Sequence, residues 1–397
     1  MSTLSIWSVE DHISENYLEL IADISNSHPL HKNQFGNLVV MDYVNVKSIF
    51  VDVENFRNFE FSDRLATVAK FANNDPGLLE FSKSLKSWLL FMNGADHLDN
   101  RKFVFKKFYE ADLEKITEEA IDEVIAEFSN TDKADLVKVG SRFSFLILKK
   151  LLSLKETDFE FIRRFAYVIT MIFEKTLTTK DLIDCAALSQ EFKIFMADLL
   201  SEYEAGVLNN VITEMKEIMG TNRIYELVAT WEFLVNAAME TTLLLVSRSI
   251  ATLIENKAKI IDWEKRDACI IAVEELIRYN SPVNWIPRQA VRDMSFKGFD
   301  ILKGDTVLLG LASANRDPSV FENPNAFDPT RKPNPHIGFG YGMHHCIGSK
   351  LSRFEMQKFF PRFMEAFPNI RFDPDEKAIW DKKVFFRGYK YLPVLLR

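Results

Sequence analysis

The chain has little cysteine, and the cysteines that it has are not arranged for disulfides. Only Cys185, Cys269 and Cys346 occur among 397 residues. Their odd number and wide spacing argue against a disulfide framework and suit a reducing cytosol. For Cys185 and Cys269 we expect buried, small apolar side chains. Cys346 therefore stands apart as the cysteine whose surroundings need another explanation.

The sequence also lacks an excess of positive charge. Its net charge is −8 and no long basic tract offsets it, which argues against a general affinity for nucleic acid. With 47% hydrophobic residues, 27% charged residues and 34 phenylalanines, the composition is that of a globular protein with an aromatic-rich core. Only local basic patches are left to bind an acidic partner.

Neither a targeting segment nor a membrane span is evident. The first residues, Met1–Trp7, lead to Glu10 and Asp11 without the apolar run of a signal peptide. We find no segment that approaches the length of a membrane span. Together with the cysteine usage, these absences predict a cytoplasmic protein without an anchor.

Glycine and proline are scarce, at 14 and 13 residues, and neither occurs between Gly220 and Pro282. Residues Ile224 to Ile254 have nearly unbroken helical character. At 1.5 Å per residue this segment predicts a helix roughly 46 Å long. So long a helix must cross most of a domain of this size.

The centre of this expected helix is polar where its flanks are apolar. Glu240, Thr241 and Thr242 interrupt an apolar run, and polar groups in such a place need partners or a task. A threonine here can donate to the carbonyl of Ala237 and loosen the helix enough to admit water, so that Glu240 passes protons inward. The alternative is a Glu240 on an exposed stripe, beside threonines satisfied by their own backbone.

Glycines surround Cys346. Gly340 and Gly342 precede it and Gly348 follows it, just before a helical pattern begins. Glycines let backbone N–H groups approach a thiolate and disperse its charge. The segment therefore predicts a loop that presents one sulfur to a large flat group and then turns into a helix. A zinc site that uses Cys346 with His336, His344 and His345 is the alternative, although adjacent residues in a glycine loop rarely converge on one tetrahedral ion.

Two further pairs of polar residues have helical spacing. Glu275 and Arg278 are three residues apart and can form an ion pair, on a helix that ends before Pro282. His97 and Arg101 are four residues apart, so they share a helical face and can grip carboxylates. The alternative for the second pair is a solvated helix surface.

The remaining elements are read from periodicity and turn residues. A short β-branched run precedes a helix near residues 44–50. A mostly helical region then runs from about Gly77 to Leu200, with breaks near Gly94, Thr131–Asp132 and Thr176–Thr179. After residue 294 we expect a hairpin over 295–305, a strand over 306–310, a long ordered loop over 314–335 with five prolines, and a helix from Lys350 to Phe367.

Taken together and in this order, these motifs resemble the cytochrome P-450 family of haem-thiolate enzymes, from about Asn37 to the end of the chain. The resemblance implies a mainly α fold with small β-sheets and a long central helix over the haem. It also implies a single haem domain over residues 1–397. The absence of a membrane anchor matches soluble bacterial members.

The resemblance implies a role for each motif. The segment Phe339–Gly348 looks like the haem-binding loop, with Cys346 as the axial ligand and metal-binding residue. Glu275 and Arg278, completed by Arg331, look like the structural ion-pair triad of the family. The segment Ala237–Thr242 resembles the oxygen-binding groove. His97, Arg101, Arg288 and His344 fall where family members hold the propionates of haem b, and Phe386–Val394 looks like the C-terminal loop and strand.

The implied activity is that of a monooxygenase. A thiolate ligand pushes electron density onto the iron and favours O–O cleavage, while Glu240 and Thr241 help deliver the protons that cleavage consumes. The expected reaction is hydroxylation of a C–H bond in a hydrophobic or aromatic small molecule of secondary metabolism. Electrons come from a ferredoxin and its reductase, since no dinucleotide fingerprint is present. Lys102, Lys106, Lys107 and Lys350 would form the patch that binds an acidic ferredoxin.

Two departures and several alternatives accompany this interpretation. Ala238 stands where the family commonly has glycine, and Pro361 should kink or end the helix after Cys346. Oxidative coupling or dehydrogenation without oxygen insertion is one alternative, and a non-catalytic haem-binding sensor or scaffold is another. A carrier protein is a further candidate partner. Candidate pocket residues are Phe81–Asn93, Val235, Met239, Thr242, Asn284–Ile286 and Val384–Phe386.

Overall fold

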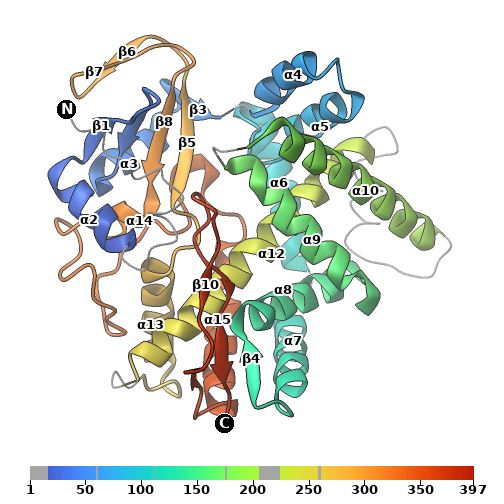
Figure 1. The fold of residues 1–397 in the computed structure, drawn as a ribbon, viewed down its shortest axis with the longest axis vertical. Helices are drawn as coiled ribbons and strands as arrows, with labels where there is room; N and C mark the ends of the chain where they lie inside the picture. The colour runs from blue at the N-terminus through green and yellow to red at the C-terminus, as the bar shows by residue number, and fades with distance from the viewer. Residues whose placement is uncertain (1–16, 60, 111, 175–176, 205–223, 258–260) are drawn as a thin grey trace. The chain divides into compact units, whose positions relative to one another are not determined.

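The computed structural model describes residues 17–59, 61–110, 112–174, 177–204, 224–257 and 261–397. Helices dominate and the sheets are small (Figure 1), which confirms the mainly α prediction. The chain forms two compact units, and each is described by itself. Unit 1 comprises residues 1–57, 121–140 and 241–397, and unit 2 comprises residues 58–120 and 141–240.

A five-stranded sheet organises the N-terminal part of unit 1 (Figure 1). Its strand order is β1-β2-β8-β5-β3, with β2 and β8 parallel, and with β1 antiparallel to β2 and β5 antiparallel to β8. The strands are short, and β2 and β8 consist mainly of valine and leucine, which suits a pleated buried surface. They are β1 (Leu30–Lys32), β2 (Leu38–Val40), β8 (Thr306–Gly310), β5 (Trp285–Ala290) and β3 (Phe56–Asn58).

Helix α3 (Tyr43–Val51) packs its apolar side on this sheet. Asp42 caps the helix, because its carboxylate accepts a bond from the backbone N–H of Asn45. Val46, Ile49 and Phe50 then share a core with Leu309 and other strand residues. The predicted strand followed by a helix is thus confirmed. Helices α2 (Tyr17–Ser27) and α14 (Leu311–Ala314) belong to the same unit.

Apart from segments of helices that also belong to unit 2, the described remainder of unit 1 includes two further long helices and three small sheets. The predicted hairpin is present, since β6 (Met294–Phe296) pairs antiparallel with β7 (Phe299–Ile301) around Gly298 at φ +87°. The other elements are α13 (Arg266–Tyr279), α15 (Ser349–Ala366), the pair β10 (Ile379–Trp380) and β11 (Tyr389–Tyr391), and the sheet of β4 (Lys133–Asp135), β12 (Pro393–Leu395) and β9 (Arg371–Phe372). We did not expect β4 within the helical region.

Pro361 does not end α15, which continues to Ala366. Proline has no N–H, so the carbonyl of Gln357 loses its usual helical donor. The thiol of Cys269 on α13 lies 3.5 Å from that carbonyl oxygen and donates to it instead. Of the two outcomes expected at Pro361, a kink or an end of the helix, the end is therefore wrong, and a thiol on a neighbouring helix supplies a donor to the carbonyl that proline leaves open.

Unit 2 is helical. Helix α4 (Phe61–Phe71) packs against α5 (Pro76–Lys86), and α10 (Thr179–Glu204) packs against both α5 and α9 (Phe159–Thr170). Our helical region began only at Gly77, so α4 was missed. The other helical elements are α6 (Gly94–Glu110), the 3₁₀ turns Glu156–Asp158 and Met171–Phe173, and two helices that run into unit 1, α7 (Leu113–Phe128) and α8 (Leu136–Leu152).

Helix α12 (Ile224–Glu255) is the predicted long helix and runs without interruption from unit 2 into unit 1. By length and composition its segment Tyr225–Glu255 could span a membrane, which corrects the expectation that no segment approaches such a length. However, 78% of its most apolar window is buried in the protein. Its apolar surface is therefore used for packing, as in the core helix of a folded domain.

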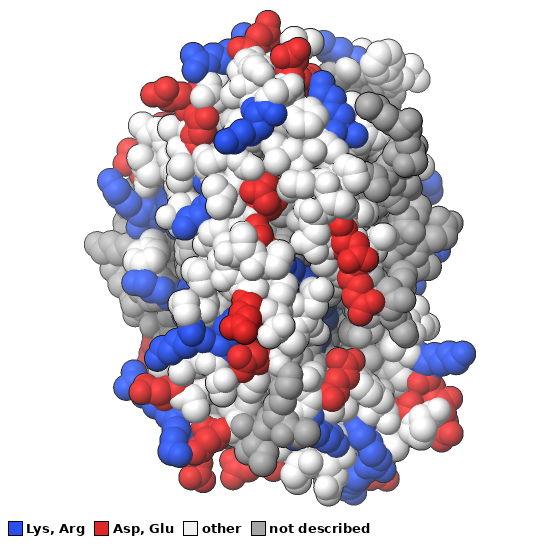
Figure 2. Space-filling model, turned by 90° about the vertical axis from the view of Figure 1, so that its left-hand side faces the viewer, with Lys and Arg blue, Asp and Glu red and all other residues white. Residues whose placement is uncertain are grey.

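Charged residues are mixed in sign on the face of the molecule that Figure 2 shows. Lysine and arginine side chains alternate there with aspartate and glutamate, with uncharged surface between them. No field of one sign covers this face, so long-range attraction of a polyanion is not expected from it.

Candidate active site

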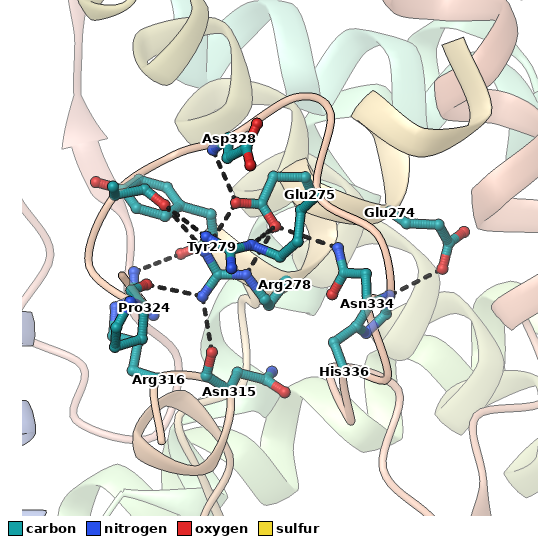
Figure 3. Close-up of polar contacts among 12 residues, drawn as sticks. Glu274, Glu275, Arg278, Tyr279, Asn315, Arg316, Pro324, Asp328, Asn334 and His336 are labelled. Carbon is teal, nitrogen blue, oxygen red and sulfur yellow. Dashed lines mark hydrogen bonds and ion pairs between the residues drawn. The ribbon is translucent and has the colours of Figure 1, made fainter. Parts of the chain in front are cut away.

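The predicted ion-pair triad is present and fully buried in unit 1 (Figure 3). Arg278 donates to both carboxylate oxygens of Glu275, from Nε at 2.7 Å and from Nη2 at 2.8 Å. The Nε of Arg331 lies 3.0 Å from Oε2 of the same carboxylate. Glu275 and Arg278 are both 0% exposed. Two guanidinium groups thus share one buried carboxylate, as the resemblance implied.

This triad fixes the long proline-containing loop onto α13. The Nη1 group of Arg278 donates to the carbonyls of Asn315 and Pro324, both at 2.8 Å (Figure 3). The backbone N–H of Asp328 donates to Oε1 of Glu275 at 2.9 Å. Buried charges are stable only when their hydrogen bonds are satisfied, and here the loop backbone satisfies them. The loop therefore holds a defined path toward His336.

A second network joins Glu274, His336 and Arg353. The Nε2 atom of His336 lies 2.9 Å from one carboxylate oxygen of Glu274, while Arg353 on α15 donates to both oxygens at 2.7 and 3.0 Å. The backbone N–H of Gly338 donates to Nδ1 of His336 at 3.2 Å. Because Nδ1 accepts, the hydrogen-bond pattern assigns the proton to Nε2, which donates to Glu274.

These bonds change the acidity of Glu274. Burial alone would raise its pKa, but the hydrogen bonds from His336 and Arg353 and the charge of Arg353 outweigh burial and hold the pKa at about 2. The carboxylate is thus ionised throughout the physiological range. It connects α13, α15 and the start of the glycine loop, a role for His336 that the sequence left open.

Replacing Glu274 by glutamine is expected to destabilise the protein at neutral pH by roughly 2 kcal/mol, after allowance for solvent screening. The folded pKa lies below the usual value of 4.5. The contribution is therefore complete above about pH 4.5 and is lost as the pH falls toward 2. Urea unfolding of both proteins from pH 7 to pH 3 measures it. A difference that stays constant with pH would contradict the assignment.

Two glycines of the loop before Cys346 have a left-handed backbone. Gly340 and Gly342 have φ values of +70° and +75°, which favour glycine. A side chain on Gly342 would also lie 2.8 Å from the carbonyl oxygen of Phe50 on α3. The N–H of Cys346 donates to the carbonyl of Phe339 at 2.9 Å, and the Arg353 guanidinium lies 4.6 Å from the Phe339 ring centre. The network of Glu274 is thus in contact with the cysteine loop.

The three cysteines differ as predicted. Cys185 and Cys269 are buried, and burial raises the pKa of Cys185 to about 12 and also raises the pKa of Cys269. Cys346 is exposed and lies just before the first turn of α15. An exposed thiol at a helix N-terminus is available as a thiolate ligand. Within the described residues, no three His, Cys, Asp or Glu side chains converge as a metal site, which disfavours the zinc alternative.

The centre of α12 has one open face and one buried face. Phe233, Ala237 and Thr241 are partly exposed and follow one another at intervals of four, so they share a face. Glu240 lies about 100° around the helix and is only 4% exposed. The alternative of an exposed Glu240 is therefore wrong. The predicted bond from Thr241 to the Ala237 carbonyl stays a prediction.

The four expected propionate-binding residues are divided between the units. Arg288 on β5 and His344, in the 3₁₀ turn Gly342–His344, belong to unit 1 with Cys346, whereas His97 and Arg101 on α6 belong to unit 2. His97 is 1% exposed, so the solvated-surface alternative is wrong for this residue. Burial and the charge of Arg101 lower the pKa of His97, which favours a neutral ring.

Arg288 is a buried guanidinium. It is 6% exposed, and burial lowers its pKa to about 10. Its Nη1 donates to the adjacent carbonyl of Pro287 at 3.1 Å, and its guanidinium carbon lies 4.9 Å from the ring centre of Phe50. Neither contact supplies a negative charge. A buried cation of this kind is stabilised by an anionic group such as a carboxylate.

The remaining candidates vary in exposure. Val235, Met239 and Phe81 are buried in the core, whereas Phe91, Thr242, Ile286 and Phe386 are partly exposed and remain available to a ligand. Lys102 and Lys350 are exposed. The side chains of Lys106 and Lys107 lie outside the described part of the structure. Sequence reasoning assigned no role to Glu274 or Arg353, because 79 residues separate these two partners and no local spacing records their contact.

Comparison with known proteins decides the family. The family model for cytochrome P-450 matches residues 250–383. The polyketide-biosynthesis cytochrome P-450 PksS of Bacillus subtilis (strain 168) is 32% identical over 321 residues, which cover 78% of this chain and 77% of the relative. This chain belongs to the cytochrome P-450 family. It is therefore an oxidoreductase of the monooxygenase type, and the family implies a haem-thiolate cofactor.

Other similar proteins agree with this cytochrome P-450 assignment. The biotin-biosynthesis cytochrome P-450 of Bacillus subtilis (strain 168) is 28% identical over 77% of this chain and 79% of its own length. The solved structure of PksS has a TM-score of 0.80 at 25% identity, covering 97% of this chain and 99% of that one. BioI, solved with an acyl carrier protein bearing hexadec-9Z-enoic acid, has a TM-score of 0.86 at 24% identity, covering 96% and 99%.

Proposed function

We propose that this cytochrome P-450 binds haem b through the Cys346 thiolate and hydroxylates a C–H bond of a hydrophobic or aromatic small molecule of secondary metabolism. The observation that carries the proposal is the exposed Cys346 on a loop of left-handed glycines, held by the network of Glu274. Membership of the family and the polyketide-biosynthesis relative support it.

The residues present fit a haem. Cys346 offers an exposed sulfur, and Arg288 is a buried cation whose described contacts are a carbonyl and an aromatic ring. A propionate carboxylate would supply the missing negative charge. In this proposal Arg288 and His344 hold the propionates together with His97 and Arg101. Cys346 is the iron ligand, and an electron-rich thiolate ligand favours O–O cleavage when the cofactor is bound.

Glu240 and Thr241 are proposed to move protons. Thr241 lies on the open face of α12, where its hydroxyl can hold a water or donate a proton. Glu240 lies on the adjacent buried face and directly precedes Thr241 in the chain, so water or a side-chain rotation can carry protons between the two residues. The pair therefore suits a relay from the protein interior to the open face.

Two macromolecular partners are proposed. Electrons come from a ferredoxin and its reductase, and the exposed Lys102 and Lys350 are candidate contacts for an acidic surface. A carrier protein that bears the substrate is the other partner. This proposal is supported by BioI, which was solved with an acyl carrier protein bearing hexadec-9Z-enoic acid, and by PksS, which is named for polyketide biosynthesis. The aromatic residues Phe91 and Phe233 would then contact an apolar chain or ring.

The proposed reaction is tested by product mass. Candidate substrates, free and attached to a carrier protein, are screened by the spectral shift that they cause in the ferric protein. Those that bind are turned over with ferredoxin, its reductase and ¹⁸O₂. Hydroxylation adds one labelled oxygen to the product. A product that only loses hydrogen would support the alternative of coupling or dehydrogenation, and binding without turnover would support a sensor or scaffold.

Replacing Arg288 by glutamine is expected to weaken haem binding by about tenfold or more, the value of a charge-assisted hydrogen bond. The same change should leave the haem-free protein equally stable or more stable, since it removes a buried cation. Haem titration and urea unfolding measure the two effects. Arg292→Gln is the matched control, because Arg292 is exposed. Unchanged haem affinity in Arg288→Gln would contradict the propionate role.

A further inference from the structure

A serine on helix α8 bonds to the backbone of α12 directly before the proton-relay residues. The hydroxyl of Ser144 lies 3.1 Å from the carbonyl oxygen of Ala238 and 3.2 Å from that of Met239. Ser144 is buried. A hydroxyl has one proton to donate, so the two carbonyls share it or receive it in turn.

The approach of the two helices is close enough to require glycine one turn earlier on α8. A side chain on Gly140 would place its Cβ 2.7 Å from the carbonyl oxygen of Leu243 and 3.0 Å from its Cα. Residues four apart share a helical face, so Gly140 and Ser144 form one contact surface on α8 (labelled with α12 in Figure 1). Because α8 comes so near, the short side chain of Ser144 reaches main-chain atoms of α12.

In a regular helix, the two carbonyls that Ser144 contacts also accept backbone hydrogen bonds. The carbonyl of Ala238 accepts from the N–H of Thr242, and the carbonyl of Met239 accepts from the N–H of Leu243. A donor from outside the helix draws such carbonyls away from the helix axis and lengthens the bonds that they accept. The turn affected contains Glu240 and Thr241.

A second polar contact, made by Asn236, holds α12 one turn before Glu240. The side-chain amide of Asn236 donates to the carbonyl of Ala166 at 2.8 Å and lies 3.0 Å from the hydroxyl of Thr170, both on α9. Asn236 lies one turn before Glu240, on the same side of the helix. This contact fixes the position of α12 before the turn that contains Glu240 and Thr241. A displacement of carbonyls by Ser144 therefore falls within that turn.

We propose that Ser144 is a positioning residue: by bonding to the carbonyls of Ala238 and Met239 it loosens one turn of α12 and orients Glu240 and Thr241. Ala238, whose carbonyl Ser144 contacts, is also a position at which this chain departs from the family. A methyl group stands where the family commonly has glycine, and the carbonyl of this same residue is one of the two that Ser144 contacts from α8. The inference deepens the proposed function and rests on it for the activity of the loaded enzyme.

The first test does not need haem. Hydrogen–deuterium exchange is measured on the purified full chain and on Ser144→Ala, over peptides that contain Thr242 and Leu243. Loss of the external donor lets both carbonyls return to the helix, so exchange at these two amides should slow by about threefold to tenfold, the equivalent of one hydrogen bond. A variant that is generally destabilised would instead exchange these amides faster, which is the opposite of the predicted change. Faster or unchanged exchange at these amides overturns the proposal.

The control variant is Ser247→Ala. The hydroxyl of Ser247 is also buried and also bonds to α12 carbonyls, but it does so from within the helix, to Leu243 at 2.9 Å. Its removal should leave exchange at Thr242 and Leu243 unchanged. If Ser247→Ala slows these amides as much as Ser144→Ala does, the effect is a general response of α12 and the proposal fails.

The second test uses the haem-loaded enzyme with its redox partners. In Ser144→Ala the share of consumed oxygen that leaves as hydrogen peroxide should rise about threefold or more, while Ser247→Ala stays near the wild-type value. An equal peroxide share in all three proteins overturns the positioning role. If the wild-type chain binds no haem through its thiolate, the proposed function fails, and the exchange experiment still decides whether Ser144 loosens α12.

Discussion

Replacing Glu275 by alanine is expected to destabilise the protein by about 3–5 kcal/mol, the cost of leaving buried charges without their partner. Arg278 and Arg331 would lose the carboxylate that both contact at 2.7–3.0 Å. A domain is commonly stable by only 5–15 kcal/mol. The variant should therefore lose a large part of its stability, as measured by urea unfolding.

The conservative variant and a surface control sharpen this test. Glu275→Gln keeps the shape of the side chain but removes its charge and turns an amide donor toward the guanidinium groups, so it should also destabilise strongly. Glu322→Ala removes an exposed carboxylate from the loop that the triad holds, and we expect a change within about 0.5 kcal/mol. A loss below about 1 kcal/mol in Glu275→Ala would show that the arginines find other partners.

Replacing Cys346 by alanine is expected to abolish oxidation of the substrate. The variant retains the loop, because the backbone bonds of the loop and the positive φ of Gly340 and Gly342 do not depend on the thiol. In the proposed function, the variant lacks the electron-rich sulfur ligand that favours O–O cleavage. Product formation and bound haem are measured together, so that loss of ligation is separated from loss of the cofactor.

Two further variants make the cysteine test specific. Cys185→Ala removes a buried thiol of high pKa and should leave product formation intact. Cys346→His offers the iron an imidazole in place of the thiolate, so it should bind haem without oxidising the substrate. Full activity in Cys346→Ala would contradict the assignment of the ligand.

The site could be predicted from the sequence where a residue type is itself unusual at its position. Glycines around Cys346 mark a left-handed loop, and the spacing of Glu275 and Arg278 marks an ion pair, which the structure confirms. The lack of glycine and proline between Gly220 and Pro282 predicted the long helix α12, because both residue types disfavour a helix interior. In each case local covalent geometry constrains the choice of amino acid.

Prediction failed where the structure depends on a contact with a distant segment. Pro361 does not end α15, because the thiol of Cys269 bonds to the free carbonyl. His336 gained its role only when the fold placed it beside Glu274. Ser144 is one of two serines in α8, and its sequence neighbours do not indicate that it reaches the backbone of α12. Such pairings are tertiary, so no periodicity in the chain records them.

The most direct test of the account is the absorption spectrum of the reduced, carbon-monoxide-bound wild-type protein. If Cys346 is the iron ligand, the spectrum shows the red-shifted Soret band of thiolate ligation, and the band is absent in Cys346→Ala. An imidazole-type spectrum of the correctly folded wild-type protein would identify His344 or His345 as the ligand and would contradict the account.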